Sequence, residues 1–214
     1  MAHVLAAGVG SILLFAASSA NAQRVVSETF MIPAADPGIQ LYVRNKHLEG
    51  RSSFPADHVV LFVHGATYAS ETMFDINLPG GSWMDFAAQK GYDTYLVDVR
   101  GYGRSTRPPS MSAPPADNPP FATTAEAVKD VSSAVDFILK RRRISKLDLV
   151  GWSWGTAIMA GYTMDNNDKV NKLRIRHFTW RKKSSPSSSI HLISGILSLA
   201  RAHTRSRSRK TECM

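Results

Sequence analysis

Three short runs that are apolar at almost every position predict buried strands: Val59–Val63, Thr94–Asp98 and Leu147–Gly151. Each is too short for an ordinary helix and ends at a glycine or a polar residue, which is typical of parallel strands covered on both faces. Val25–Ile32 and Ile39–Arg44 instead alternate between apolar and polar residues on either side of an Asp-Pro-Gly turn. These two segments predict an antiparallel hairpin at an edge of the sheet.

Helical patterns separate the predicted strands. Ser82–Lys90 and Trp154–Met164 are two of them, and residues 124–141 give the clearest. In the clearest one a capping box, Thr123 with Glu126, precedes apolar residues spaced three and four apart. The basic cluster Lys140–Arg143 suits the end of that helix and is expected to face solvent. Strands alternating with helices predict an α/β fold with a mostly parallel sheet and flanking helices.

The first 22 residues have the pattern of a signal peptide. Val4–Phe15 is apolar, and Ala20-Asn21-Ala22 has the small-residue pattern of a cleavage site. We expect an exported protein, periplasmic or secreted, that begins near Gln23 and has no stable membrane span after cleavage. An uncleaved membrane anchor is the alternative, although the apolar run is short for crossing a bilayer.

Basic residues are concentrated at the end of the chain. The formal net charge is +9, and from Asn171 onward there are 11 Lys and Arg against one acidic residue, Glu212. The preceding part is close to neutral, so we expect no nucleic acid as a partner of the folded body. The serine- and arginine-rich character after residue 184 is typical of low-complexity sequence. We therefore predict an incomplete α/β domain over residues 23–170 and, over residues 171–214, an unrelated tail produced by a frame change or truncation.

The composition, with 43% hydrophobic and 20% charged residues, is that of an ordinary globular protein. Its one cysteine, Cys213, excludes an internal disulfide framework and a thiolate metal cluster. We expect neither a cofactor nor a metal. Residues 105–121 hold six of the eleven prolines and predict an irregular loop, a candidate border for a pocket.

The sequence Gly-x-Ser-x-Gly carries the candidate chemistry at Gly151–Gly155. A predicted strand precedes it and a helical pattern follows, which is the context of a nucleophile elbow. In such a turn the serine is lifted above the sheet, and the flanking positions must be small because strand and helix pass close together. Gly151 and Gly155 meet that need, and Ser153 stands at a helix N-terminus, where backbone N–H groups favour negative charge.

Residues 25–170 resemble the N-terminal two-thirds of the α/β-hydrolase fold superfamily, serine hydrolase branch. Three segments carry the resemblance in the family's order: Leu61–Gly65 with its His-Gly turn, Asp98–Ser105 and Gly151–Gly155. The resemblance implies that Ser153 attacks a carbonyl carbon and that the backbone N–H groups of Trp154 and Ala66 hold the oxyanion. A serine at this position argues against the dehalogenase and epoxide-hydrolase branches, which use aspartate.

The resemblance also implies structural roles for nearby residues. The histidine of the His-Gly pair, His64, is expected to be structural, and Asp98 and Arg100 are expected to pin the loop that follows their strand. Trp152 and Trp154 either line an acyl pocket or pack against the core, and the sequence leaves both open.

A serine hydroxyl needs a base and an orienting acid, and these are not apparent. In this fold they follow the nucleophile in the order acid, then histidine, each after a further strand. Asp165 and Asp168 lie too near the elbow, and Glu212 follows all the later histidines: His177, His191 and His203.

Three functions remain. The first is a serine hydrolase of ester, thioester, amide or similar small-molecule carbonyl substrates, impaired by the missing partners. The second is a non-catalytic remnant of such a hydrolase, and the third is a binding protein that uses its basic tail. The oligomeric state is not indicated.

Overall fold

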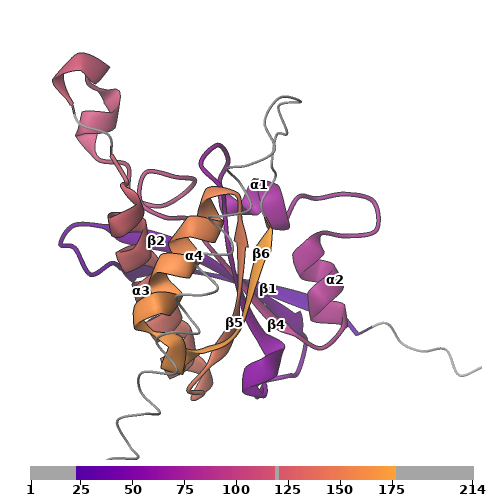
Figure 1. The fold of residues 1–214 in the computed structure, drawn as a ribbon. Coiled ribbons are helices and arrows are strands. Elements are labelled where there is room, and N and C mark those ends of the chain that lie inside the picture. The colour runs from indigo at the N-terminus through magenta and orange to yellow at the C-terminus, as the bar shows by residue number, and fades with distance from the viewer. Residues whose placement is uncertain (1–22, 119–120, 177–214) are drawn as a thin grey trace, which may run out of the picture.

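One six-stranded sheet organises the chain, with the strand order β1-β2-β4-β3-β5-β6 (Figure 1). The computed structural model describes residues 23–118 and 121–176, so the predicted signal peptide and residues 177–214 lie outside the described part. The strands are β1 (Val25–Pro33), β2 (Gln40–Leu48), β3 (Val59–Val63), β4 (Asp93–Val97), β5 (Leu147–Trp152) and β6 (Val170–Arg176).

Parallel pairing joins β4 to β3 and β3 to β5, as the continuous apolar runs predict. A further parallel strand, β6, pairs with β5. The hairpin β1–β2 is antiparallel and lies at one edge, which confirms the second strand prediction. β2 also pairs antiparallel with β4. The chain thus has the predicted α/β architecture.

Helices cover the two faces of the sheet separately (Figure 1). The helices are α1 (Ser70–Phe74), α2 (Trp83–Gln89), α3 (Thr124–Arg142) and α4 (Trp154–Asp165). α3 and α4 pack with alternate strand residues such as Leu61 and Leu149, and α1 and α2 pack with the intervening ones such as Phe62 and Val150. In the part of the chain that the structure describes, no helix is long and apolar enough to cross a membrane.

α3 begins as the sequence predicts, with the Thr123 hydroxyl and the Glu126 carboxylate closing a capping box. Its basic end differs from the prediction. The Arg142 side chain is only 7% exposed and is paired with Asp93, which is fully buried, at 2.6 Å. Its guanidinium also donates to the Tyr95 hydroxyl at 2.8 Å. The expectation that the whole cluster faces solvent is therefore wrong for this arginine, which fastens α3 to the sheet.

β6 was not predicted as a strand, and the sheet continues to Arg176, past the boundary expected at residue 170. β5, which leads to Ser153, is therefore an internal strand of the sheet. Leu173 packs against the core, whereas Lys172 and Arg174 are exposed. Asn171 and Ile175 are exposed as well, so β6 lacks the continuous apolar run by which the other parallel strands were predicted.

Candidate active site

The candidate site lies where the carboxyl ends of β3, β4 and β5 meet. β4 follows β3 on one side of it, and β5 lies on the other side, so the strand order reverses between β3 and β5. Such a reversal opens a crevice at the carboxyl edge of a parallel sheet. The loops that begin at His64, Asp98 and Ser153 all start at this edge.

Ser153 occupies the sharp turn between β5 and α4. Its backbone has φ 53° and ψ −115°, a region that residues other than glycine rarely adopt. Such a conformation costs about 1–3 kcal/mol and persists only where the surroundings enforce it. The Ser153 hydroxyl makes no capping hydrogen bond to α4, although the residue stands at the N-cap.

Three glycines make room for this turn. A Cβ on Gly151 would lie 2.5 Å from the Gly155 carbonyl oxygen, and one on Gly155 would lie 2.4 Å from the Val63 oxygen. A Cβ on Gly65 would lie 2.9 Å from the Ser153 Cβ. The close approach of strand and helix inferred from the sequence is therefore present at Gly151 and Gly155, and the His-Gly turn directly adjoins the serine.

His64 is buried and holds two backbone segments together. We assign its ring as the neutral form in which Nδ1–H donates to the Gly65 oxygen at 2.6 Å and Nε2 accepts from the Val99 N–H at 3.2 Å. Burial lowers the pKa of this imidazole below its ordinary value. Both ring nitrogens are thus engaged with the backbone, which confirms the structural role expected of His64.

The Gly65–Ala66 peptide is oriented by that histidine. No cis peptide bond occurs in the described residues, and in a trans peptide the carbonyl and the following N–H point in opposite directions. Because His64 holds the Gly65 carbonyl, the Ala66 N–H points away from the ring. Within the described ranges, the backbone N–H groups of Ala66 and Trp154 have no hydrogen-bond acceptor.

Asp98 and Arg100 anchor the loop after β4, as expected from the sequence. The Asp98 carboxylate accepts from the backbone N–H groups of Ser70 at 2.8 Å and Arg104 at 3.1 Å. The Arg100 guanidinium pairs with the buried Asp130 of α3 at 2.7 Å. These contacts fix the loops around the site and leave neither side chain available for chemistry.

Aromatic side chains border the site. The Trp154 indole donates to the Thr124 hydroxyl at 3.0 Å and lies 5.9 Å from the Tyr102 ring, centroid to centroid, whereas Trp152 packs beside the cluster under α1 and α2. The Tyr102 hydroxyl donates to the Ala66 carbonyl oxygen at 2.8 Å. Sequence reasoning missed Tyr102 and Thr124, because only the folded chain brings them to the elbow.

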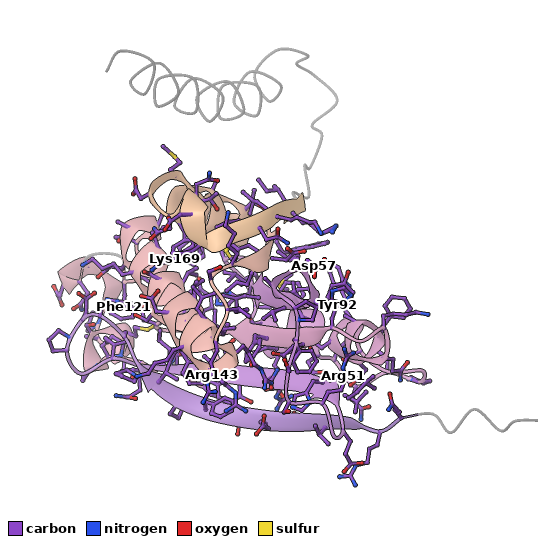
Figure 2. The ribbon with its side chains drawn as sticks, turned by 90° about the horizontal axis from the view of Figure 1, so that it is seen from below. Arg51, Asp57, Tyr92, Phe121, Arg143 and Lys169 are labelled. Atoms are coloured by element: carbon purple, nitrogen blue, oxygen red, sulfur yellow. The ribbon has the colours of Figure 1, made fainter. Side chains whose placement is uncertain are left out.

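An open cavity of about 340 Å³ adjoins these residues. It is bordered by the segment after His64, the turn after β4 and the proline-rich loop, in agreement with the border expected of that loop. Phe121 is one of the residues that line the cavity. In Figure 2 it lies far from Asp57 and Tyr92, which come just before the amino ends of β3 and β4. The lining residues are Thr67, Ala69, Gly101, Tyr102, Gly103, Arg107, Met111, Phe121 and Ala122.

No histidine in residues 23–118 and 121–176 reaches Ser153. His47 lies on β2 with its Nδ1 at the Leu48 oxygen, and His58 stacks on Tyr92 near the amino end of β3. The ring nitrogens of His64 are both engaged. The three later histidines lie outside the described residues.

Comparison with known proteins identifies the family of the chain. A sequence model described as the alpha/beta hydrolase fold matches residues 58–175, more than half of the chain. The chain therefore belongs to the alpha/beta hydrolase fold family, and the α/β-hydrolase resemblance found in its motifs is confirmed.

Individual relatives include lipases. The chain is 30% identical to gastric triacylglycerol lipase of Bos taurus over 132 residues, which cover 62% of this chain and 33% of that protein. It is 32% identical to a probable lipase of Schizosaccharomyces pombe over 116 residues, 53% of this chain and 26% of that one. The matched part is thus a third or less of each of these two relatives.

Among solved structures, a predicted CIB-like hydrolase from Thermoplasma acidophilum superposes with a TM-score of 0.49 at 15% sequence identity. The superposition covers 75% of this chain and 68% of that one.

Proposed function

We propose that this chain carries the nucleophile and the oxyanion hole of a serine hydrolase, with Ser153 as the nucleophile. The observation that carries the proposal is the Ser153 backbone, held at φ 53° and ψ −115° between β5 and α4 by closely packed glycines. An elbow of this kind exposes the serine hydroxyl above the sheet, where a substrate can reach it. The hydroxyl is not used as a helix cap, so it is available for reaction.

In the proposed reaction, the Ser153 Oγ bonds to the carbonyl carbon of an ester while its proton passes to a base. The carbonyl electron pair moves to oxygen, and that oxyanion accepts hydrogen bonds from the Ala66 and Trp154 N–H groups. Collapse breaks the bond to the alcohol, which leaves with a proton, and water later releases the acyl group from Ser153. Removing one such donor typically costs about 10²–10³ in rate.

A small-molecule carboxylic ester is the substrate class we favour over a thioester or an amide. Both curated relatives described above are named as lipases, and a serine stands at the elbow. We further propose that the protein is exported after cleavage behind Ala22.

The described residues include no histidine that could act as the general base for Ser153. Since none of their histidines reaches Ser153, we expect slow reaction at this serine and impaired turnover. The same observation favours the second candidate function, a hydrolase-fold remnant without activity. The serine hydrolase and the inactive remnant can be distinguished by testing whether Ser153 reacts in a folded sample.

Labelling with a fluorophosphonate, followed by peptide mass spectrometry, tests the proposal. The Ser153 Oγ forms a bond to phosphorus, fluoride leaves, and the hydroxyl proton passes to solvent. We expect an adduct on Ser153 in the full chain and in Ser133→Ala, a control on α3, and none in Ser153→Ala. A folded sample without any adduct would favour the remnant, and an adduct on another serine would exclude Ser153 as the nucleophile.

A second variant asks whether the late histidines act as the base. We expect the triple variant His177→Ala, His191→Ala and His203→Ala to label at the wild-type rate, because the fold requires an orienting acid between a further strand and the histidine, and the one acidic residue after β6, Glu212, follows all three histidines. A marked loss of labelling would instead assign the base to one of them.

A further inference from the structure

Ala66 lies between two peptide groups that are each held by a side chain. The carbonyl of the preceding peptide accepts from His64 Nδ1 at 2.6 Å, and the carbonyl of the following peptide accepts from the Tyr102 hydroxyl at 2.8 Å. The orientations of these two planes determine the φ and ψ angles of the residue between them. Ala66 is therefore fixed on both sides, and so is the direction of its N–H.

The Tyr102 ring also lies between His64 and Trp154, whose backbone N–H is the other proposed oxyanion donor. Its centroid lies 4.5 Å from that of His64 and 5.9 Å from that of Trp154. Trp154 is held in turn by its hydrogen bond to Thr124. The Tyr102 side chain thus contacts both residues whose backbone N–H groups form the proposed hole. Ala66 lies in the loop after β3, whereas Trp154 is the first residue of α4.

Tyr102 is itself anchored. Its backbone N–H donates to the Val99 oxygen, and its carbonyl accepts from the Ser105 N–H, both at 3.0 Å. The same turn holds the far end of the segment after Ala66, since Asp98 accepts from the Ser70 N–H at 2.8 Å. Burial raises the pKa of the Tyr102 hydroxyl, so it stays protonated and can donate near neutral pH.

We propose that Tyr102 is a positioning residue of the oxyanion hole, which acts through Ala66 by holding the 66–67 peptide with its hydroxyl. This inference rests on the proposed function. Without the hydroxyl, the ψ angle of Ala66 becomes free, and only His64 restrains the N–H that must meet the oxyanion. The aromatic ring, by contrast, maintains packing between His64 and Trp154, so the two parts of the side chain have separable effects.

The test is the rate of phosphonylation of Ser153 in the full chain, resolved into the maximal rate constant kinact and the binding constant Ki. Tyr102→Phe keeps the ring and removes only the hydroxyl, and we expect kinact to fall about tenfold, less than the 10²–10³ for loss of a donor. We expect an unchanged Ki and a melting temperature close to that of the wild type. The matched control is Tyr68→Phe, which removes the hydroxyl of an exposed tyrosine two residues after Ala66 and should leave kinact unchanged.

The outcomes separate this inference from the proposed function. If Ser153 is labelled but Tyr102→Phe retains the wild-type kinact, Tyr102 has no positioning role and the proposed function stands. A fall in melting temperature or a rise in Ki with no change in kinact would assign Tyr102 to folding or substrate contact instead. If the wild-type chain is not labelled at Ser153, the proposed function fails and this inference fails with it.

Discussion

Gly155→Ala tests the close packing of α4 on β3, on which the elbow depends. The added Cβ would lie 2.4 Å from the Val63 oxygen and 2.6 Å from the His64 oxygen. Carbon atoms of side chains do not approach oxygen this closely, so the backbones must separate by more than half an ångström. The added Cβ is attached directly to the helix backbone and both oxygens belong to the backbone, so no side-chain rotation relieves the contact.

The expected cost follows from that geometry. Overpacking a close-packed interior typically costs about 1–3 kcal/mol, and a clash of a Cβ with backbone oxygens, which cannot rotate away, belongs at the upper end. For a domain of this size, 1 kcal/mol lowers the melting temperature by about 2–4 °C. We therefore expect Gly155→Ala to lower the free energy of unfolding by about 3 kcal/mol and the melting temperature by about 6–12 °C.

Gly161→Ala provides the matched control in the same helix. Its Cβ would lie 3.2 Å from a methyl group of Val128, which can move, and alanine favours a helix over glycine by about 1 kcal/mol. Urea denaturation followed by circular dichroism should therefore place this variant within about 1 kcal/mol of the wild type. If Gly155→Ala were as stable as Gly161→Ala, α4 would not lie against β3 as described, and the structural basis of the elbow would fail.

Two further predictions concern buried charged and titratable groups. The pKa of His64 is lowered by burial, so the unfolded chain takes up a proton first as the pH falls below about 6.5. The free energy of unfolding should then be lower at pH 5.5 than at pH 7.5, by up to about 1.4 kcal/mol. Urea titrations should show this decrease also in His58→Gln, which lacks an exposed imidazole, and equal stability at both pH values would contradict it. Arg142→Ala leaves the buried Asp93 without its ion pair and should cost about 3–5 kcal/mol in urea denaturation. Lys140→Ala, an exposed change on the same helix turn, should cost within about 0.5 kcal/mol, and equal losses in the two variants would contradict the buried pairing.

The parts of the fold that the sequence predicts are those with a strong local pattern. β3 is apolar at every position, and the capping box at Thr123 marks the beginning of α3. β6 was missed because most of its side chains are exposed, Lys172, Arg174 and Ile175 among them, so it has no continuous apolar run. Arg142 was misassigned because its partner, Asp93, is distant in the sequence and meets it only in the folded chain.

In the candidate site, too, the local features were predictable and the long-range contacts were not. Ser153 and its flanking glycines are visible in five consecutive residues, because the steric requirement of the elbow is local. The hydrogen bond from Tyr102 to Ala66 joins loops that follow different strands, and nothing in the spacing of these residues indicates it. Local sterics are therefore predictable from this sequence, whereas the contacts that orient the proposed oxyanion donors are not.

The most direct test of the central claim is a crystal structure of the chain after reaction with a fluorophosphonate. The account predicts phosphorus bonded to the Ser153 Oγ and a phosphoryl oxygen about 2.7–3.1 Å from the backbone nitrogens of both Ala66 and Trp154. An adduct on another residue would contradict the claim that Ser153 is the nucleophile. A phosphoryl oxygen turned toward solvent, away from both nitrogens, would contradict the proposed oxyanion hole.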